Sequence, residues 1–159
     1  MRYLGLDLGT KTLGVSLSDT TLTIANTLKI IRYKENDFNY LINEIKKIID
    51  EYDVVKIVLG FPKNMNNTIG DHGSMSISFK QLLMNSLDIE VVLQDERLST
   101  VEATNYMLEA NISRKKRKKK IDALAANIIL QTYLDKEKGG RLWKKKLWLL
   151  KLWMMKEKK

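Results

Sequence analysis

The chain has 159 residues, 44% of them hydrophobic, which is enough for one globular domain with a full-sized core. It contains no cysteine, which excludes disulfides and thiolate metal sites, and no apolar run long enough to cross a membrane. We therefore expect a cytoplasmic protein with no signal peptide and no membrane partner.

The net charge of +9 is concentrated in two segments. Residues 114–120, RKKRKKK, and residues 139–159 each contribute +7, which leaves −5 for the rest of the chain. A mildly acidic body with localised positive charge favours a polyanionic partner such as nucleic acid. The alternative for these two segments is a solvated loop and a charged tail.

The first third of the chain predicts three antiparallel strands. Residues 2–8 read as a buried strand and residues 9–12 as a tight turn. Leu13, Val15 and Leu17 then alternate with small residues, which predicts a strand buried on one face only. A third extended segment is expected over residues 22–31.

The rest of the chain alternates helices with buried strands. Asn36 or Asp37 is expected to cap a helix that ends near Tyr52. The further elements are a strand over 54–59, a polar loop over 60–73, a helix over 74–86 with Ile77, Leu82 and Leu83 inward, a strand over 89–93, a helix from Ser99 to Leu108, a basic loop over 114–120 and a helix over 121–134.

This order predicts an α/β fold with one mixed, five-stranded sheet. Three antiparallel strands come first, two parallel strands follow, and helices cover both faces. We expect one domain over residues 1–138. Residues 139–159 form a basic tail that holds all three tryptophans, and its role stays open between a membrane or ribosome contact and a disordered extension.

Acidic residues occur at the ends of several predicted elements. Asp7 ends the first strand, Asp95 and Glu96 follow the fifth, and Asp122 begins the last helix. Because parallel strands share a carboxyl edge, we expect Asp7, Glu96 and Asp122 to converge there, with Asp95 pointing to the opposite side. Clustered carboxylates repel unless a divalent cation such as Mg²⁺ or Mn²⁺ binds them. Two such ions ~4 Å apart suit phosphodiester hydrolysis.

Each acid also has a simpler interpretation. Asp7 could form an Asx turn, and Glu96 could pair with Arg97 on the surface. Asp122 could be the acid that a helix N-terminus favours. Asp19 is interpreted as a hairpin residue. The shared location of three acids at element ends favours the metal site over these alternatives.

Four stretches together resemble the YqgF/RuvX family of RNase H-like nucleases. They are GLDLGTKTLGVSLSD (5–19), GFPKNMNNTIGDHG (60–73), QDERLSTVEA (94–103) and KKKIDALAANIILQTYL (118–134). The resemblance implies an RNase H-like five-stranded sheet and a divalent-metal phosphodiesterase. Family members are named as pre-16S rRNA nucleases and, earlier, as Holliday junction resolvases. Phe61, where the family usually has leucine, and the tail depart from the pattern.

The resemblance also implies roles for particular residues. Asp7, Glu96 and Asp122 match the family's acidic triad, which implies catalysis and Mg²⁺ or Mn²⁺ binding. The other signature positions are matched by Lys11, Pro62, Asn64, Asn66 and Arg97, and of these Lys11, Asn64, Asn66 and Arg97 are expected to contact substrate. We add the basic segment to this substrate-binding set: Arg114, Lys115, Lys116, Arg117, Lys118, Lys119 and Lys120.

Three further interpretations remain open at this point. The stretch GLDLGTKTLGVS (5–16) also resembles the phosphate-binding opening of actin-like and Hsp70-like ATPases. Those proteins need a second large domain, for which 159 residues leave no room. A non-catalytic rRNA-binding assembly factor would have no reason to gather acids against a phosphate. Branched DNA is the alternative substrate to precursor rRNA, and the chain is expected to be a monomer or weak homodimer.

Overall fold

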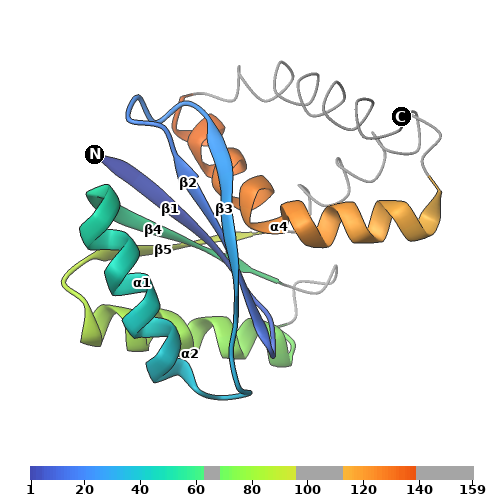
Figure 1. Ribbon diagram of the computed structural model, residues 1–159, viewed down its shortest axis with the longest axis horizontal. Helices are drawn as coiled ribbons and strands as arrows, with labels where there is room; N and C mark the ends of the chain where they lie inside the picture. The colour runs from blue at the N-terminus through green and yellow to red at the C-terminus, as the bar shows by residue number, and fades with distance from the viewer. Residues whose placement is uncertain (63–68, 96–112, 139–159) are drawn as a thin grey trace.

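The computed structural model describes residues 1–62, 69–95 and 113–138, with only the backbone described for residues 117–123. Figure 1 shows a twisted sheet between two layers of helices. The elements are β1 (Arg2–Leu8), β2 (Thr12–Ser18), β3 (Ala25–Arg32), α1 (Phe38–Tyr52), β4 (Val54–Phe61), α2 (Asp71–Ser86), β5 (Glu90–Asp95) and α4 (Arg114–Glu137). The helix expected over 99–108 and the tail over 139–159 lie outside the described residues.

The strands form one mixed sheet in the order β3-β2-β1-β4-β5. The pairs β1–β2 and β2–β3 are antiparallel, whereas β1–β4 and β4–β5 are parallel. This confirms the predicted sheet. The carboxyl ends of β1, β4 and β5 therefore lie at one edge, which is where ligands bind in open sheets of this kind.

Helices cover both faces of the sheet, as predicted. On one face, α1 and α2 pack over a large core that includes Leu6 of β1 and Leu59 of β4. Asp37 caps α1 by accepting a hydrogen bond from the backbone N–H of Tyr40 at 3.4 Å. On the other face, Leu130 and neighbouring residues of α4 pack against a smaller core. The protein therefore has three layers, with the sheet buried between two layers of helices.

The prediction that β2 is buried on one face only is wrong. Ser16 and Ser18 are as fully buried as Leu17 between them, because α4 covers their face of the sheet. Their hydroxyls are satisfied locally: Ser16 donates to the Ala126 carbonyl at 2.8 Å, and Ser18 accepts from the Tyr3 N–H at 2.8 Å. Small residues here permit the close approach of a helix.

Two predicted boundaries around α2 also move. Strand β4 continues to Phe61, and α2 begins at Asp71, so the expected loop over 60–73 is shorter at both ends. Ile77, expected to point inward, is 42% exposed, whereas Leu83 is fully buried. The helix starts three residues earlier than predicted, and the buried positions Gly73, Ser76, Phe79 and Leu83 define its inner face.

The basic segment over 114–120 is helical, which corrects the prediction of a loop. Ser113 caps α4 by accepting from the backbone N–H of Lys116 at 3.4 Å. Lysine and arginine are good helix formers, so a capped run of them continues directly into the apolar part of the helix. Figure 1 shows the first part of α4 pointing away from the sheet while the second part lies against it. None of the helices in the described residues is long and apolar enough to span a membrane.

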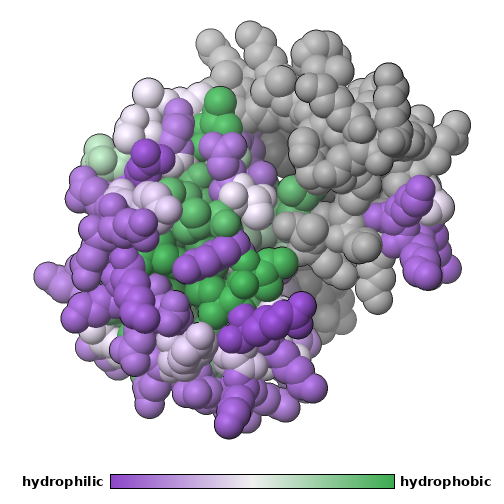
Figure 2. All heavy atoms as spheres, viewed as in Figure 1, coloured by the Kyte–Doolittle hydropathy of each residue, from purple (hydrophilic) through white to green (hydrophobic). Residues whose placement is uncertain are grey.

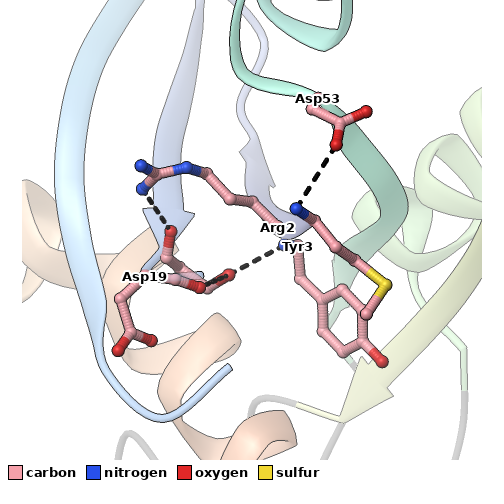
Figure 3. A network of polar contacts seen from close by, with 6 residues as sticks. Arg2, Tyr3, Asp19 and Asp53 are labelled. Atoms are coloured by element: carbon pink, nitrogen blue, oxygen red, sulfur yellow. Dashed lines mark hydrogen bonds and ion pairs between the residues drawn. The ribbon is translucent and has the colours of Figure 1, made fainter. Parts of the chain in front are cut away.

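Polar contacts fix the edge of the sheet opposite the carboxyl ends of β1, β4 and β5 (Figure 3). Arg2 donates to the Ser18 carbonyl at 3.0 Å, and the N-terminal amine pairs with Asp53 at 3.3 Å. Asp19 lies at this edge, because β2 is antiparallel to β1, and accepts from the N–H groups of Thr23 and Ile24. Burial raises the pKa of Asp19, but its hydrogen bonds outweigh burial and lower it overall. Asp19 is thus a turn residue, as predicted.

Candidate active site

Asp7 lies near the end of β1, half-buried, on the α4 face of the sheet. Its neighbours Leu6 and Leu8 point into the core under α1 and α2, so alternation turns Asp7 to the other side. Asp7 pairs with Gly14 of β2 in register. The prediction that Asp7 sits at the carboxyl edge of the parallel strands is therefore confirmed.

Gly14 leaves a notch between Asp7 and α4. A Cβ atom added to Gly14 would lie 3.6 Å from the Cβ of Asp7 and 3.4 Å from the Cβ of Ala126. This notch would admit a methyl group at ordinary contact distances beside Asp7. Ala126 belongs to α4 and Gly14 to β2, so the notch lies between two elements that are 112 positions apart in the sequence.

The direction of α4 relates position 122 to Asp7. Tyr3 near the start of β1 contacts Tyr133, with ring centroids 6.1 Å apart, and Gly5 faces Leu130 and Ala126. The helix therefore runs antiparallel to β1, and its residue numbers fall toward the carboxyl edge. Position 122 precedes Ala126 by four residues, about one turn of the same helix.

The start of α4 changes the interpretation of Asp122. The helix begins at Arg114, so Asp122 is in its third turn and cannot be an acid that stabilises the helix N-terminus. The prediction that Asp122 begins the helix is wrong. The side chain of Asp122, like those of Arg117, Lys118, Lys119 and Lys120, lies outside the described part of the structure.

Strand β5 ends at Asp95, directly before Glu96. Val92 packs on the α4 side of the sheet, and Gln94, two residues on, is buried and donates to the Asp95 carbonyl at 3.1 Å. Gln94 pairs with Gly60, which puts it level with Asp7 two strands away, about 10 Å across the sheet. By alternation Asp95 takes the opposite face, as predicted. Glu96 lies outside the described residues.

The turn between β1 and β2 positions Lys11. The Gly9 N–H donates to the Thr12 carbonyl at 2.8 Å, and the Tyr33 N–H donates to the Lys11 carbonyl at 3.0 Å. The Tyr33 hydroxyl also donates to the Gly9 carbonyl. Burial and the negative charge of Glu35 both raise the pKa of Tyr33, so the hydroxyl stays a donor. Lys11 itself is exposed at the carboxyl edge, where it was expected to meet substrate.

The remaining predicted residues are placed only in part. Pro62 directly follows β4 at the same edge. Arg114, Lys115 and Lys116 are exposed on the first turn of α4. Asn64, Asn66 and Arg97 lie outside the described residues. Within the described ranges no three acidic or histidine side chains are grouped closely enough to hold a metal ion.

The sequence interpretation missed the residues that let α4 approach the site. Gly14 and Ser16 were taken as the small residues of a half-buried strand, and Gly5 was given no particular role in its buried strand. Their signal was the recurrence of Gly or Ser at every second position facing α4. Such a row marks a sheet surface on which another backbone lies closely.

Comparison with known proteins identifies relatives that are named as nucleases or resolvases. The family model described as "RuvX: Holliday junction resolvase" matches residues 1–136. The "Putative pre-16S rRNA nuclease" of Bacillus pumilus is 50% identical over 135 residues, covering 85% of this chain and 98% of that protein. The protein of the same name from Clostridium beijerinckii is 51% identical over 137 residues, covering 85% and 96%.

A solved structure supports the fold independently of sequence. "T. thermophilus RuvC in complex with Holliday junction substrate" aligns with a TM-score of 0.56 at 9% identity, covering 88% of this chain and 97% of that one. A second structure, of RuvC from Thermus thermophilus, gives 0.55 at 10% identity, covering 88% and 98%. These likenesses confirm the RNase H-like fold. With its first 136 residues matched by the family model and about half of them identical to those of its relatives, the chain belongs to the RuvX family.

Proposed function

We propose that this chain is a divalent-metal-dependent nuclease whose active site forms around Asp7, Glu96 and Asp122. Membership of the RuvX family makes it a hydrolase of nucleic-acid phosphodiester bonds. The observation that carries the site is the position of Asp7. It is half-buried at the carboxyl edge, beside the Gly14 notch, and Ala126 at that notch is one helical turn from position 122 in α4.

The donor set fits Mg²⁺ or Mn²⁺, because carboxylate oxygens are the ligands these ions prefer. A strand that kept its alternation for one more residue would bring Glu96 to the face that Val92, Gln94 and Asp7 share. Ions bound by these carboxylates would neutralise the negative charge on the attacking and leaving oxygens of the phosphodiester. The chain itself contributes rigid positions for the acids. Asp7 belongs to the central strand β1, and Asp122 belongs to α4, which is hydrogen-bonded to the neighbouring strand β2.

The basic start of α4 is proposed to bind the phosphate backbone. It has no acid in its first turn, and cations near a helix N-terminus are unfavourable for the macrodipole. Pairs such as Arg114 with Lys118 and Lys115 with Lys119 add like-charge repulsion at helical spacing. A polyanion would relieve both costs, and the same helix carries Asp122 only two residues after the run ends.

We assign the substrate as precursor 16S rRNA, cleaved during maturation of its 5′ end, with residues 1–138 as the catalytic domain in the cytoplasm. The support is the name "Putative pre-16S rRNA nuclease" of relatives about 50% identical over nearly their whole length. Branched DNA is the second candidate, since the family description and the RuvC structure both refer to Holliday junctions.

Side-by-side cleavage assays test this assignment. A precursor rRNA fragment and a four-way DNA junction are incubated with the parent chain and Mg²⁺ or Mn²⁺. We expect cleavage of the rRNA fragment only with a divalent cation. Preferential cutting of the junction would move the assignment to branched DNA.

Substitution of the acids tests the site. Asp7→Asn and Asp122→Asn should each abolish cleavage while RNA binding persists or tightens, because a repelling charge is removed without loss of basic residues. Asp50→Asn, exposed on α1, removes the same charge elsewhere and should cleave like the parent. Cleavage by purified Asp7→Asn at the parent's rate would refute the catalytic role of Asp7, whereas no cleavage by the parent chain with either cation would leave a non-catalytic rRNA-binding protein.

A further inference from the structure

The end of β3 and the β1–β2 turn form one exposed surface on the Asp7 side of the sheet. Asp7 pairs with Gly14, and Gly14 pairs with Ile30, so the three lie in one row across β1, β2 and β3. Two residues further toward the carboxyl edge, and on the same face by alternation, Thr12 pairs with Arg32. We call the three exposed residues of this surface, Lys11, Ile30 and Arg32, the β3 platform.

The platform is open although α4 covers the same face nearby. Helix α4 crosses β3 at its beginning, where the Gln131 side chain accepts from the Ala25 N–H at 2.9 Å. Further along β3, Ile30 is 52% exposed and Arg32 is exposed. Figure 2, viewed from the β3 side, shows hydrophobic and hydrophilic residues next to each other along this strand.

The platform is also preorganised and positively charged. Pairing of Thr12 with Arg32 and the hydrogen bond from the Tyr33 N–H to the Lys11 carbonyl hold its two basic residues in one unit. Lys29 and Lys34 add positive charge at exposed positions, and Glu35 is the one acid over residues 25–35. Among the described residues, neither Lys11 nor Arg32 forms an ion pair.

We propose that the β3 platform binds the phosphodiester backbone of the nucleic-acid substrate, on the side of Asp7 that faces away from β5. This inference rests on the proposed nuclease function. Two strand spacings and two residues along β3 separate Asp7 from Arg32, about 12 Å. That equals roughly three to four nucleotides at the duplex rise of ~3.4 Å per strand, so one backbone can reach both.

A second copy of the chain is a poorer occupant of this edge strand. Antiparallel pairing of two β3 strands would bring their Lys29 and Arg32 side chains toward those of the partner, and like charges on paired strands repel. The register shift between Val15 and Ser16 also distorts the strand, which is a common protection against edge pairing. Ile30 offers an apolar contact that suits a sugar or base between charged phosphates.

Salt-dependent binding tests the proposal without requiring cleavage. In the Asp7→Asn background, Lys11→Ser/Arg32→Ser should weaken binding of the rRNA fragment about tenfold at 0.1 M salt. The slope of log affinity against log salt should become less steep by about 1.4, because two contacts to a single strand are lost. The control, Lys46→Ser/Lys47→Ser, removes the same charge from exposed positions of α1 on the opposite face.

Two outcomes would overturn the platform. One is an equal change of slope in both double variants, which would mean a diffuse effect of net charge. The other is a change of mass in light scattering for the Lys11/Arg32 variant alone, which would assign β3 to self-association. A photo-crosslinking residue at position 30 should label the RNA, whereas one at position 46 should not. The two proposals can fail separately. If Asp7→Asn still cleaves but the Lys11/Arg32 variant shows a less steep dependence of affinity on salt, the proposed catalytic site is wrong and the proposed binding surface is supported.

Discussion

Gly5 and Gly14 lie on adjacent strands under α4 but leave very different amounts of space. A Cβ atom at Gly5 would lie 2.6 Å from the Leu130 Cβ and 2.9 Å from the Ala126 carbonyl, far inside van der Waals contact. At Gly14 the nearest atoms are 3.4 Å or more away. Only the first position sets how closely the helix and the sheet can approach.

Gly5→Ala should therefore lower the free energy of unfolding by about 1–3 kcal/mol, because the added methyl group forces α4 away from β1. The same shift would carry position 122 away from Asp7, so divalent-cation-dependent cleavage should fall as well. Urea denaturation and cleavage at matched folded fractions measure the two effects.

Gly14→Ala is the matched control for stability. Its methyl group meets ordinary contact distances, so the free energy of unfolding should change by less than about 1 kcal/mol. Equal destabilisation by the two substitutions would show that the distance between α4 and β1 is not set at Gly5.

The C-terminal half of α4 is fastened to the sheet by polar side chains as well as by packing. Lys56 of β4 donates to the Tyr133 hydroxyl at 3.0 Å and lies 3.4 Å from Glu137 and 3.7 Å from Glu90. Its side chain is only 14% exposed and stands 4.8 Å from the Tyr3 ring centroid. Burial lowers the pKa of Lys56, but the Tyr133 hydrogen bond and the charge of Glu137 outweigh it and raise the pKa overall.

Lys56→Met should cost about 1–3 kcal/mol of unfolding free energy at neutral pH, since it leaves the polar groups of Tyr133 and Glu137 without their shared donor. Because the folded-state pKa is raised, the difference from the parent should be full below pH 10.5 and shrink only above it. Urea titrations at several pH values measure this. Lys47→Met removes a side chain that is 72% exposed in its pair with Glu44, so it should change stability by less than about 0.5 kcal/mol; an equally large loss there would contradict the argument.

At the level of elements, local patterns predicted the strands well and helix starts less well. Buried apolar runs placed β1, β4 and β5, and Asp37, one of two residues named for the cap of α1, is the one that forms it. The start of α4 was missed because seven adjacent positive charges suggested a loop, whereas propensity and the Ser113 cap favour a helix. Ile77 was misplaced because its helix begins at Asp71.

The site was predictable only where it follows from strand ends. Asp7 could be placed because parallel strands share a carboxyl edge. The contact of Gly14 with Ala126 could not, since no local pattern reports which helix face meets which strand across 112 positions. Likewise, the exposure of Ile30 depends on where α4 crosses β3, a tertiary fact that the sequence of β3 does not contain.

At the scale of the whole molecule, charge and folding are carried by different parts of the chain. Both hydrophobic cores of the described structure are complete by Leu134, and the family match ends at residue 136. Residues 139–159 nevertheless carry +7 of the net +9. This division predicts that stability and long-range attraction to nucleic acid can be separated.

Removal of residues 139–159 should therefore leave the urea midpoint unchanged and slow association with the rRNA fragment at low salt. The truncated chain keeps a net charge of only +2, and steering by a positive field accelerates association most where screening is weak. Stopped-flow association at 0.02 M and 0.5 M salt measures the effect, with the two chains converging at the higher concentration. A lower urea midpoint for the truncated chain would mean that the tail packs on the domain, in which case residues 1–138 would not be an independent folding unit.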